Sequence, residues 1–327
     1  MAGDCFTLPL STKNQDTAEQ LLQTWQKGHM HPSTLLYGLN HGAAVHICQR
    51  LIMKALGGAY QPNKPHPDVM WLGLSEDEGG KQSLSLSIEQ VRGARAFAYK
   101  SSVTGGPRFL IIDPAEALTP QAQNALLKTL EAPPKGVYFM LISSHLHALI
   151  ATIRSRCQKH PIHDHDFDTF QKGLMMLNPD AAYDPLPLKW ICALKHGDYT
   201  AVQQLEDFDF EGFEEGCDQL ITHGNQSVLL KMIYKVAGKK DKRMVDAFVH
   251  GLLLALVDIK NYHQGAPTVV PENTLKAWAE HTSLAKVAEG YCDLSRTLKQ
   301  HDQLGLDPRQ TMINAVSVLG RLNGNPQ

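Results

Sequence analysis

Residues 120–158 read PQAQNALLKTLEAPPKGVYFMLISSHLHALIATIRSRCQ, and they carry the clearest structural signal in the chain. Thr119 can cap a helix that begins at Pro120, because a threonine hydroxyl accepts backbone N–H groups and proline suits the first helical turn. Consecutive prolines at 133 and 134 end this helix. The apolar run 137–142 predicts a buried strand. The stretch closes with the tripeptide Ser155, Arg156 and Cys157.

The rest of the first half alternates β-rich runs with helical stretches, which is typical of a parallel sheet covered by helices. Between the strand-like runs, apolar residues recur at helical spacing. The candidate strands are 34–37, 69–72, 109–112 and 137–142, and the candidate helices between them are 43–56 and 88–99. The sequence therefore predicts an α/β core with a parallel sheet.

The second half has no comparable strand signals after residue 160. Its helical stretches are separated by glycine, proline and asparagine, and Asp307 with Pro308 forms another cap and first-turn pair. The expected helices include 186–194, 200–205, 243–260, 274–279, 284–298 and 308–322. We therefore expect an all-α region after the core.

Composition excludes several classes of protein. With 327 residues, 43% of them hydrophobic, the chain can form two or three packed domains. Its 31 basic and 33 acidic residues nearly balance, so the net charge does not attract the protein to nucleic acid or to anionic membranes. Six scattered cysteines fit a reducing cytosol, and we expect no signal peptide. The longest apolar stretch, 244–259, contains Asp246 and Asp258, so we expect no membrane span and a cytoplasmic location.

The sequence GLNHGAAV at 38–45 stands between a strand-like run and a helix, where a phosphate-binding loop would lie. Such a loop needs glycines whose amides surround phosphate, a lysine for its charge and a hydroxyl for magnesium. Two alignments of this segment to the motif are possible. In both, the lysine position falls on Ala43 or Ala44 and the hydroxyl position on Ala44 or Val45. We therefore expect severely weakened ATP binding, and an ordinary strand-to-helix turn is the alternative. The positions concerned are Gly38, Gly42, Ala43, Ala44 and Val45.

The predicted strand 109–112 ends in Asp113, which in an active ATPase would help to hold magnesium. The next position would carry the glutamate that activates water, but Pro114 stands there. Glu116 is three residues beyond the aspartate, which does not favour it as a substitute. We expect a degenerate magnesium motif without hydrolytic activity.

The run TPQAQNALLKTLEAPP at 119–134, followed by IRSRC at 153–157, resembles the clamp-loader branch of the AAA+ ATPases. The degenerate loop makes the chain similar to the delta-prime family of bacterial DNA polymerase III in particular. HPDVMW at 66–71 and IEQVR at 88–92 also resemble that family. The resemblance implies three domains. They are an AAA+ core over 1–160, a small helical lid over 161–206 and a helical collar for oligomerisation over 207–327.

The resemblance also implies a role for the arginine of the closing tripeptide. Arg156, supported by Ser155 and Cys157, would be an arginine finger that reaches the ATP site of a neighbouring gamma/tau subunit. Arg154 is two residues away, which on a helix points it about 200° around the axis, so it cannot share this role. The implied partners are gamma/tau and delta subunits and, indirectly, the sliding clamp and primed DNA.

Metal binding is not expected. The family often carries a four-cysteine zinc module, but the matching interval 57–65, GGAYQPNKP, contains no cysteine. A second cluster has suitable residue types, yet we interpret it as a polar hinge between core and lid. Its members are Cys157, His160, His163, Asp164, His165 and Asp166. We therefore expect neither ATP nor zinc as a cofactor.

These observations favour a non-hydrolysing clamp-loader subunit of the DNA polymerase III holoenzyme that donates Arg156 to a neighbour. A different class, an autonomous AAA+ ATPase with an unconventional loop, would instead bind magnesium-ATP by itself. A third hypothesis, a scaffold without catalytic contribution, differs from the first only in the effect of replacing Arg156.

Overall fold

The computed structural model divides the chain into two compact units, Met1–Pro179 and Asp180–Gln327. It describes residues 8–62, 64–74, 83, 85–177, 185–199, 202–205, 208–237, 242–304 and 306–323. Cys5, residue 63 of the cysteine-free interval and the start of the expected helix 200–205 lie outside this description. The first unit contains a sheet, and the described residues of the second form helices and connecting turns.

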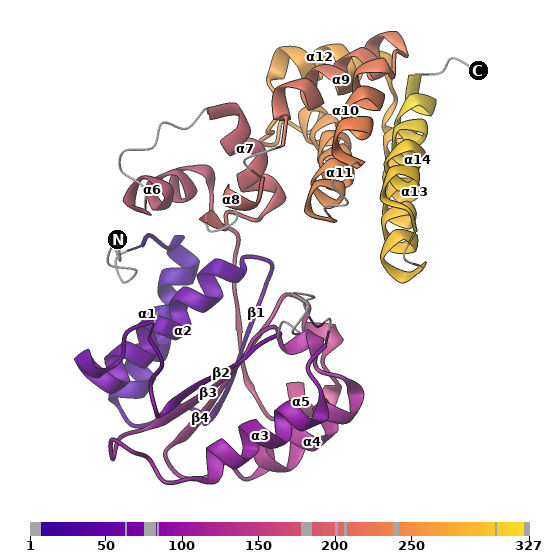
Figure 1. The fold of residues 1–327 in the computed structure, drawn as a ribbon. Coiled ribbons are helices and arrows are strands. Elements are labelled where there is room, and N and C mark those ends of the chain that lie inside the picture. Colours follow the sequence, from indigo (N-terminus) through magenta and orange to yellow (C-terminus); the bar gives the residue numbers. More distant parts are fainter. Residues whose placement is uncertain are drawn as a thin grey trace. The chain divides into compact units, whose positions relative to one another are not determined.

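The sheet of the first unit has five parallel strands in the order β2-β3-β4-β1-β5 (Figure 1). All four predicted strands are confirmed, with bounds that differ from the prediction by at most one residue at each end. In the register of the two central strands, Leu110 pairs with Phe139. The strands are β1 (Ser33–Tyr37), β2 (Val69–Leu72), β3 (Arg108–Ile112), β4 (Val137–Ser143) and β5 (Gln158–Pro161).

The edge strand β5 was missed by the sequence prediction. Its residues are Gln158, Lys159, His160 and Pro161, which show neither an apolar run nor clear alternation. Proline is tolerated at a sheet edge because no ladder hydrogen bond is needed there. Pairing with β1 makes this segment a strand, and its ends place the arginine turn before it and the histidine-rich segment after it.

Helices cover both faces of the sheet (Figure 1). Successive side chains of a strand point to opposite faces, so Phe109 and Ile111 pack with α1 and α2, whereas Leu110 and Ile112 pack with α3 and α4. This arrangement builds one apolar core on each face. The helices of this unit are α1 (Thr12–Gln26), α2 (His41–Leu56), α3 (Ile88–Tyr99), α4 (Pro120–Glu131), α5 (Ala151–Arg154) and α6 (Phe167–Leu177).

Helix α4 forms as its sequence predicts. The side chain of Thr119 accepts a hydrogen bond from the backbone N–H of Ala122 at 3.2 Å, and Pro120 occupies the first turn. Leu126 and Leu130 are buried against the sheet. The helix ends at Glu131, just before the two prolines. Its position is therefore held by a cap, an apolar face and a defined end.

The second unit is a set of packed helices around a core that contains Trp190, Phe213, Phe248 and Trp278. The predicted cap of the last helix is confirmed, because the Asp307 side chain accepts the backbone N–H of Gln310. The helices are α7 (Pro185–Leu194), α8 (Val202–Leu205), α9 (Phe210–His223), α10 (Ser227–Ala237), α11 (Lys242–His263), α12 (Glu272–His281), α13 (Leu284–Leu304) and α14 (Pro308–Gly320). Single 3-10 turns occur at Gly57–Ala59, Ala115–Ala117, Leu146–Ala148 and Arg321–Asn323.

The boundary between the units falls after α6, so this helix belongs with the sheet, and α7 and α8 belong with the helical unit. The finer division into a lid over 161–206 and a collar over 207–327 stays a prediction. Among the described helices, none has the length and apolar character that a membrane crossing needs.

Candidate functional site

The segment that follows β1 turns sharply beside β5. The backbone N–H of Gly38 donates to the carbonyl of Ser143, and the N–H of Ile162 donates to the carbonyl of Tyr37. A Cβ atom at Gly38 would lie only 2.1 Å from the carbonyl oxygen of Ile162. Only glycine fits at this close approach. The predicted loop therefore leaves the sheet at its carboxyl edge, where ligands bind in parallel α/β sheets.

Helix α2 begins directly after this turn. The Asn40 side chain caps the helix by accepting the N–H of Ala43 at 3.0 Å. Ala43 and Ala44 are 0% and 2% exposed and belong to the apolar core beneath the helix, and Val45 packs at its edge. A lysine at Ala43 or Ala44 would have to leave this core to reach a phosphate. These residues do not fit magnesium-ATP.

The aspartate at the end of β3 is bonded to a residue of this loop. Nε2 of His41 lies 2.7 Å from Oδ1 of Asp113. Pro114 has no carboxylate, and Oε1 of Glu116 accepts the backbone N–H of Ser144 at 3.0 Å. The carboxyl edge of the sheet thus brings together the predicted loop and the predicted aspartate, but it holds them with the chain's own hydrogen bonds.

The arginine turn follows the single-turn helix α5. The Arg156 guanidinium donates from Nη1 to the carbonyl of Thr152 at 2.9 Å and from Nη2 to Oε1 of Glu131. The hydroxyl of Ser155 donates to the same carbonyl of Thr152. Cys157 is buried in the core below, and burial raises the pKa of its thiol to about 12, which makes the thiol an inert packing group. The backbone of the turn is thereby anchored while the arginine side chain stays at the surface.

The two arginines of this turn have different partners. Nη1 of Arg154 lies 3.2 Å from Nδ1 of His147, in the segment that leads into α5. Arg156 instead contacts Glu131 at the end of α4. This separation agrees with the expectation that the two side chains point in different directions.

Gln123, for which the sequence pattern predicts no role, fixes the segment before α5. Its side chain is 5% exposed, donates to the carbonyl of Leu118 at 3.2 Å and accepts the N–H of Ile150 at 2.9 Å. A glutamine among apolar residues on the buried face of a helix is the only sequence signal that could have indicated this role. Through Gln123, α4 positions the approach to the arginine turn.

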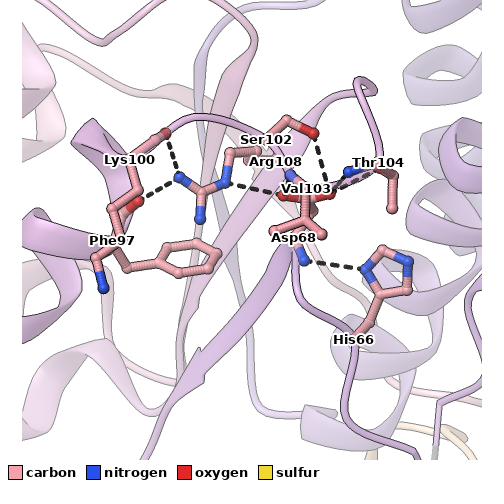
Figure 2. Close-up of polar contacts among 8 residues, drawn as sticks. All are labelled: His66, Asp68, Phe97, Lys100, Ser102, Val103, Thr104 and Arg108. Carbon is pink, nitrogen blue, oxygen red and sulfur yellow. Dashed lines mark hydrogen bonds and ion pairs between the residues drawn. The ribbon is translucent and has the colours of Figure 1, made fainter.

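A second polar network lies at the opposite edge of the sheet, where β2 and β3 begin. Figure 2 shows the Asp68 carboxylate between Arg108 and the loop after α3. Asp68 is fully buried, its Oδ1 lies 3.2 Å from Nε of Arg108, and the carboxylate accepts the N–H of Val103 at 3.0 Å. It also accepts hydrogen bonds from the N–H and the hydroxyl of Thr104 and from the hydroxyl of Ser102.

These contacts determine the charge of Asp68. Burial by itself would raise its pKa, but the hydrogen bonds from Thr104, Val103 and Ser102 hold the pKa well below its ordinary value. Arg108 donates to the carbonyls of Phe97 and Lys100 and stacks on the Phe97 ring. The HPD stretch therefore contributes a buried ion pair that ties the α3–β3 loop to the sheet, far from the loop at its carboxyl edge.

The histidine-rich segment after the arginine turn is part of the structural framework. The side-chain amide of Asn14 donates to the carbonyl of His163 at 2.7 Å and accepts the N–H of His163 at 2.8 Å. The Asp166 side chain caps the start of α6 by accepting the N–H of Thr169. His160 and His165 are buried, and burial lowers the pKa of His160. Within the described parts of the chain, no three His, Cys, Asp or Glu side chains are grouped to hold a metal ion.

Comparison with known proteins finds sequence similarity to one family over the sheet-bearing half of the chain. Residues 13–166 match the family model described as DNA polymerase III, delta subunit. The chain is 34% identical over 146 residues to the DNA polymerase III subunit delta' of Pseudomonas aeruginosa, which covers 39% of this chain and 42% of that protein. It is 26% identical over 206 residues to the delta' subunit of Buchnera aphidicola, which covers 61% and 59%.

A solved structure has the same fold along most of the chain. The DNA polymerase III gamma subunit-related protein of Thermotoga maritima superposes with a TM-score of 0.50 at 18% identity, covering 94% of this chain and 99% of that one. The sequence matches are shorter: they span 26% to 59% of the length of the delta' relatives. The family model thus matches the sheet-bearing half, and the longest of these sequence matches covers 61% of the chain.

Proposed function

We propose that this chain, whose residues 13–166 match the family model and which is similar to delta' subunits of DNA polymerase III, is a clamp-loader subunit that does not hydrolyse ATP itself and that donates Arg156 to the ATP site of a neighbouring subunit. It would act as an accessory subunit of the DNA polymerase III holoenzyme and bind neither ATP nor zinc. The observation that carries the proposal is the combination of an anchored, surface-exposed arginine with a phosphate loop that lacks its own lysine.

The loop supports the first half of the proposal. Lysine and a magnesium-binding hydroxyl are the groups that hold triphosphate, and buried Ala43 and Ala44 replace them. The Asp113 carboxylate is bonded to His41, and Pro114 stands where water would be activated. A chain with these substitutions keeps the architecture of a nucleotide-binding domain and lacks its chemistry.

The arginine turn supports the second half. A guanidinium is always charged and offers paired N–H groups that match phosphate oxygens. Arginine fingers of this kind contribute about 10³- to 10⁵-fold to the rate of phosphoryl transfer. Arg156 suits this role because the buried Cys157 and the bonded Ser155 hold its backbone, while its side chain is 32% exposed.

The partners follow from the family. The neighbour that receives Arg156 would be a gamma/tau subunit, a delta subunit would complete the assembly, and the sliding clamp and primed DNA would be handled by the complex as a whole. The helical unit would supply the contacts that hold this chain in the oligomer. We place the complex in the cytoplasm, where replication proteins of bacteria work.

Replacing Arg156 in a loader reconstituted from this chain, gamma/tau and delta tests the proposal. We expect R156A to remove the contribution of the one ATP site that receives the finger, so that the DNA-stimulated ATPase rate falls to that of the remaining sites. R154A is the matched control, because Arg154 is two residues away and contacts His147. Size-exclusion chromatography must show that both variants assemble. An unchanged rate for assembled R156A would refute the finger.

A further inference from the structure

We propose that Glu131 is a positioning residue for Arg156: it holds the guanidinium in one orientation at the subunit surface, ready for the neighbour's phosphates. This inference rests on the proposed function of Arg156 and adds a residue to it. The observation is the ion pair between Nη2 of Arg156 and Oε1 of Glu131, which joins two segments 25 residues apart in the chain.

Glu131 is attached to a rigid element. It is the last residue of α4, whose neighbouring residues Thr129 and Leu130 are 0% and 3% exposed. Gln123 of the same helix binds the segment before α5. The carboxylate therefore has a defined place relative to the arginine turn.

The guanidinium is held at two of its nitrogens. Nη1 donates to the carbonyl of Thr152 and Nη2 donates to Glu131, so the planar group is restrained from two directions. Arginine has five N–H donors in a fixed plane, and these two bonds leave three of them available. A long side chain that is restrained in this way loses less conformational entropy when it binds a phosphate.

The exposure of the pair allows this role. The side chains of Arg156 and Glu131 are 32% and 49% exposed, so their attraction is screened by water and is weak. A triphosphate in a partner's site carries more negative charge than one carboxylate. Because the ion pair between Arg156 and Glu131 is exposed and weak, it does not prevent the remaining N–H groups of Arg156 from binding that triphosphate. Glu131 thus orients the guanidinium of Arg156 and leaves it able to bind the neighbour's phosphates.

The test uses the reconstituted loader with the variants E131Q, E131D, R156A and the double variant E131Q/R156A. E19Q is the matched control, since Glu19 is an exposed glutamate of the same unit on α1. The measurement is the DNA-stimulated ATPase rate as a function of ATP concentration, which separates kcat from KM. Assembly of each variant is checked by size-exclusion chromatography.

We expect E131Q to lower kcat at the site that receives the finger by roughly two- to fivefold, the size of an exposed ion-pair coupling, with KM for ATP unchanged. E131D should restore part of the loss, and E19Q should behave as the parent protein. In the R156A background, E131Q should have no further effect, because Glu131 acts only through that arginine.

Two different failures can be told apart. If R156A leaves the rate unchanged, the proposed function itself fails. If R156A lowers the rate but E131Q leaves it unchanged, raises it, or lowers it equally in the presence and absence of Arg156, the finger stands and the positioning role of Glu131 is overturned.

Discussion

Nε2 of His41 lies 2.7 Å from Oδ1 of Asp113, so the first turn of α2 is joined to the carboxyl end of β3 by the chain's own side chains. The two residues are 72 positions apart in the sequence. In a working ATPase the phosphate loop and the magnesium-binding aspartate meet at this edge with nucleotide between them. In this chain the Asp113 carboxylate is bonded to His41 instead. The first turn of α2, which would bind phosphate in an ATPase, carries the buried residues Ala43 and Ala44.

Restoring the missing lysine should not restore ATP binding. In A43K a charged side chain replaces an alanine that is 0% exposed, so overpacking and charge burial should lower the free energy of unfolding by at least about 2 kcal/mol. H41A changes a side chain that is 46% exposed and should be tolerated. Calorimetric titration with magnesium-ATP should detect no binding to the parent chain or to either variant. Micromolar binding by any of them would instead support the autonomous ATPase.

Removing the buried carboxylate of Asp68 should destabilise the sheet-bearing unit. D68A leaves Arg108 buried without its counter-ion and should cost about 3–5 kcal/mol. The loss should be seen locally in hydrogen exchange, because the amides of Val103 and Thr104 lose their acceptor. D16N, on the exposed face of α1, is the control. Unchanged protection of the two amides in D68A would contradict the role of this network.

The sheet-bearing unit should lose stability in mild acid through His46. This side chain is 2% exposed, and burial, with further contributions from Arg50 and His165, lowers its pKa from 6.5 to about 4. The unfolded chain therefore binds more protons, so this contribution is complete above pH 6.5 and is lost as the pH falls toward 4. The loss is on the order of 3 kcal/mol at most.

The H46L variant tests this dependence by urea unfolding at several pH values. Leucine cannot be protonated, so the stability of H46L should fall less steeply between pH 6.5 and 4 than that of the parent chain. A slope remains because the pKa of His160 is lowered in the same direction. H29L, at an exposed position, should keep the parent slope. Equal slopes for H46L and the parent would show that His46 does not titrate as described.

Asp258 of the helical unit should have the opposite pH dependence. It is 1% exposed, and burial raises its pKa from 3.8 to about 6, although hydrogen bonds from the N–H groups of Val270 and Val269 oppose the shift. The folded state therefore binds more protons. Its contribution to stability is complete below pH 3.8 and is lost as the pH rises through 6.

Two variants separate the charge of Asp258 from its hydrogen bonds. D258N keeps a side-chain oxygen and should abolish this pH dependence while unfolding no more easily than the parent at pH 7.5. D258A leaves two backbone N–H groups without acceptors and should cost about 1–3 kcal/mol for each. Hydrogen exchange of the Val269 and Val270 amides should be faster in D258A alone. Equal exchange in the two variants would show that the backbone bonds do not depend on the oxygen at this position.

Local sequence patterns predicted most of the secondary structure of the sheet-bearing unit. The runs at 34–37, 109–112 and 137–142 became strands that are almost entirely buried, as expected for a parallel sheet covered on both faces, whereas the edge strand β2 is only partly buried. Thr119 and Pro120 defined the start of α4 for equally local reasons. The edge strand β5 was missed because pairing with β1, rather than its own polar residues, makes it a strand. Gln123 was missed because its partners lie in other segments of the chain.

By itself, the sequence determined which chemical groups this protein has: an arginine between Ser155 and Cys157, and no lysine in the loop that ends at Val45. Only the tertiary structure decided which of these groups meet. His41 with Asp113, Asp68 with Arg108, and Glu131 with Arg156 are separated by 25 to 72 residues or lie on different elements. Helical and strand periodicity predicts only contacts between residues a few positions apart, whereas these pairs form because the fold brings helix ends, strand ends and turns from distant parts of the chain together.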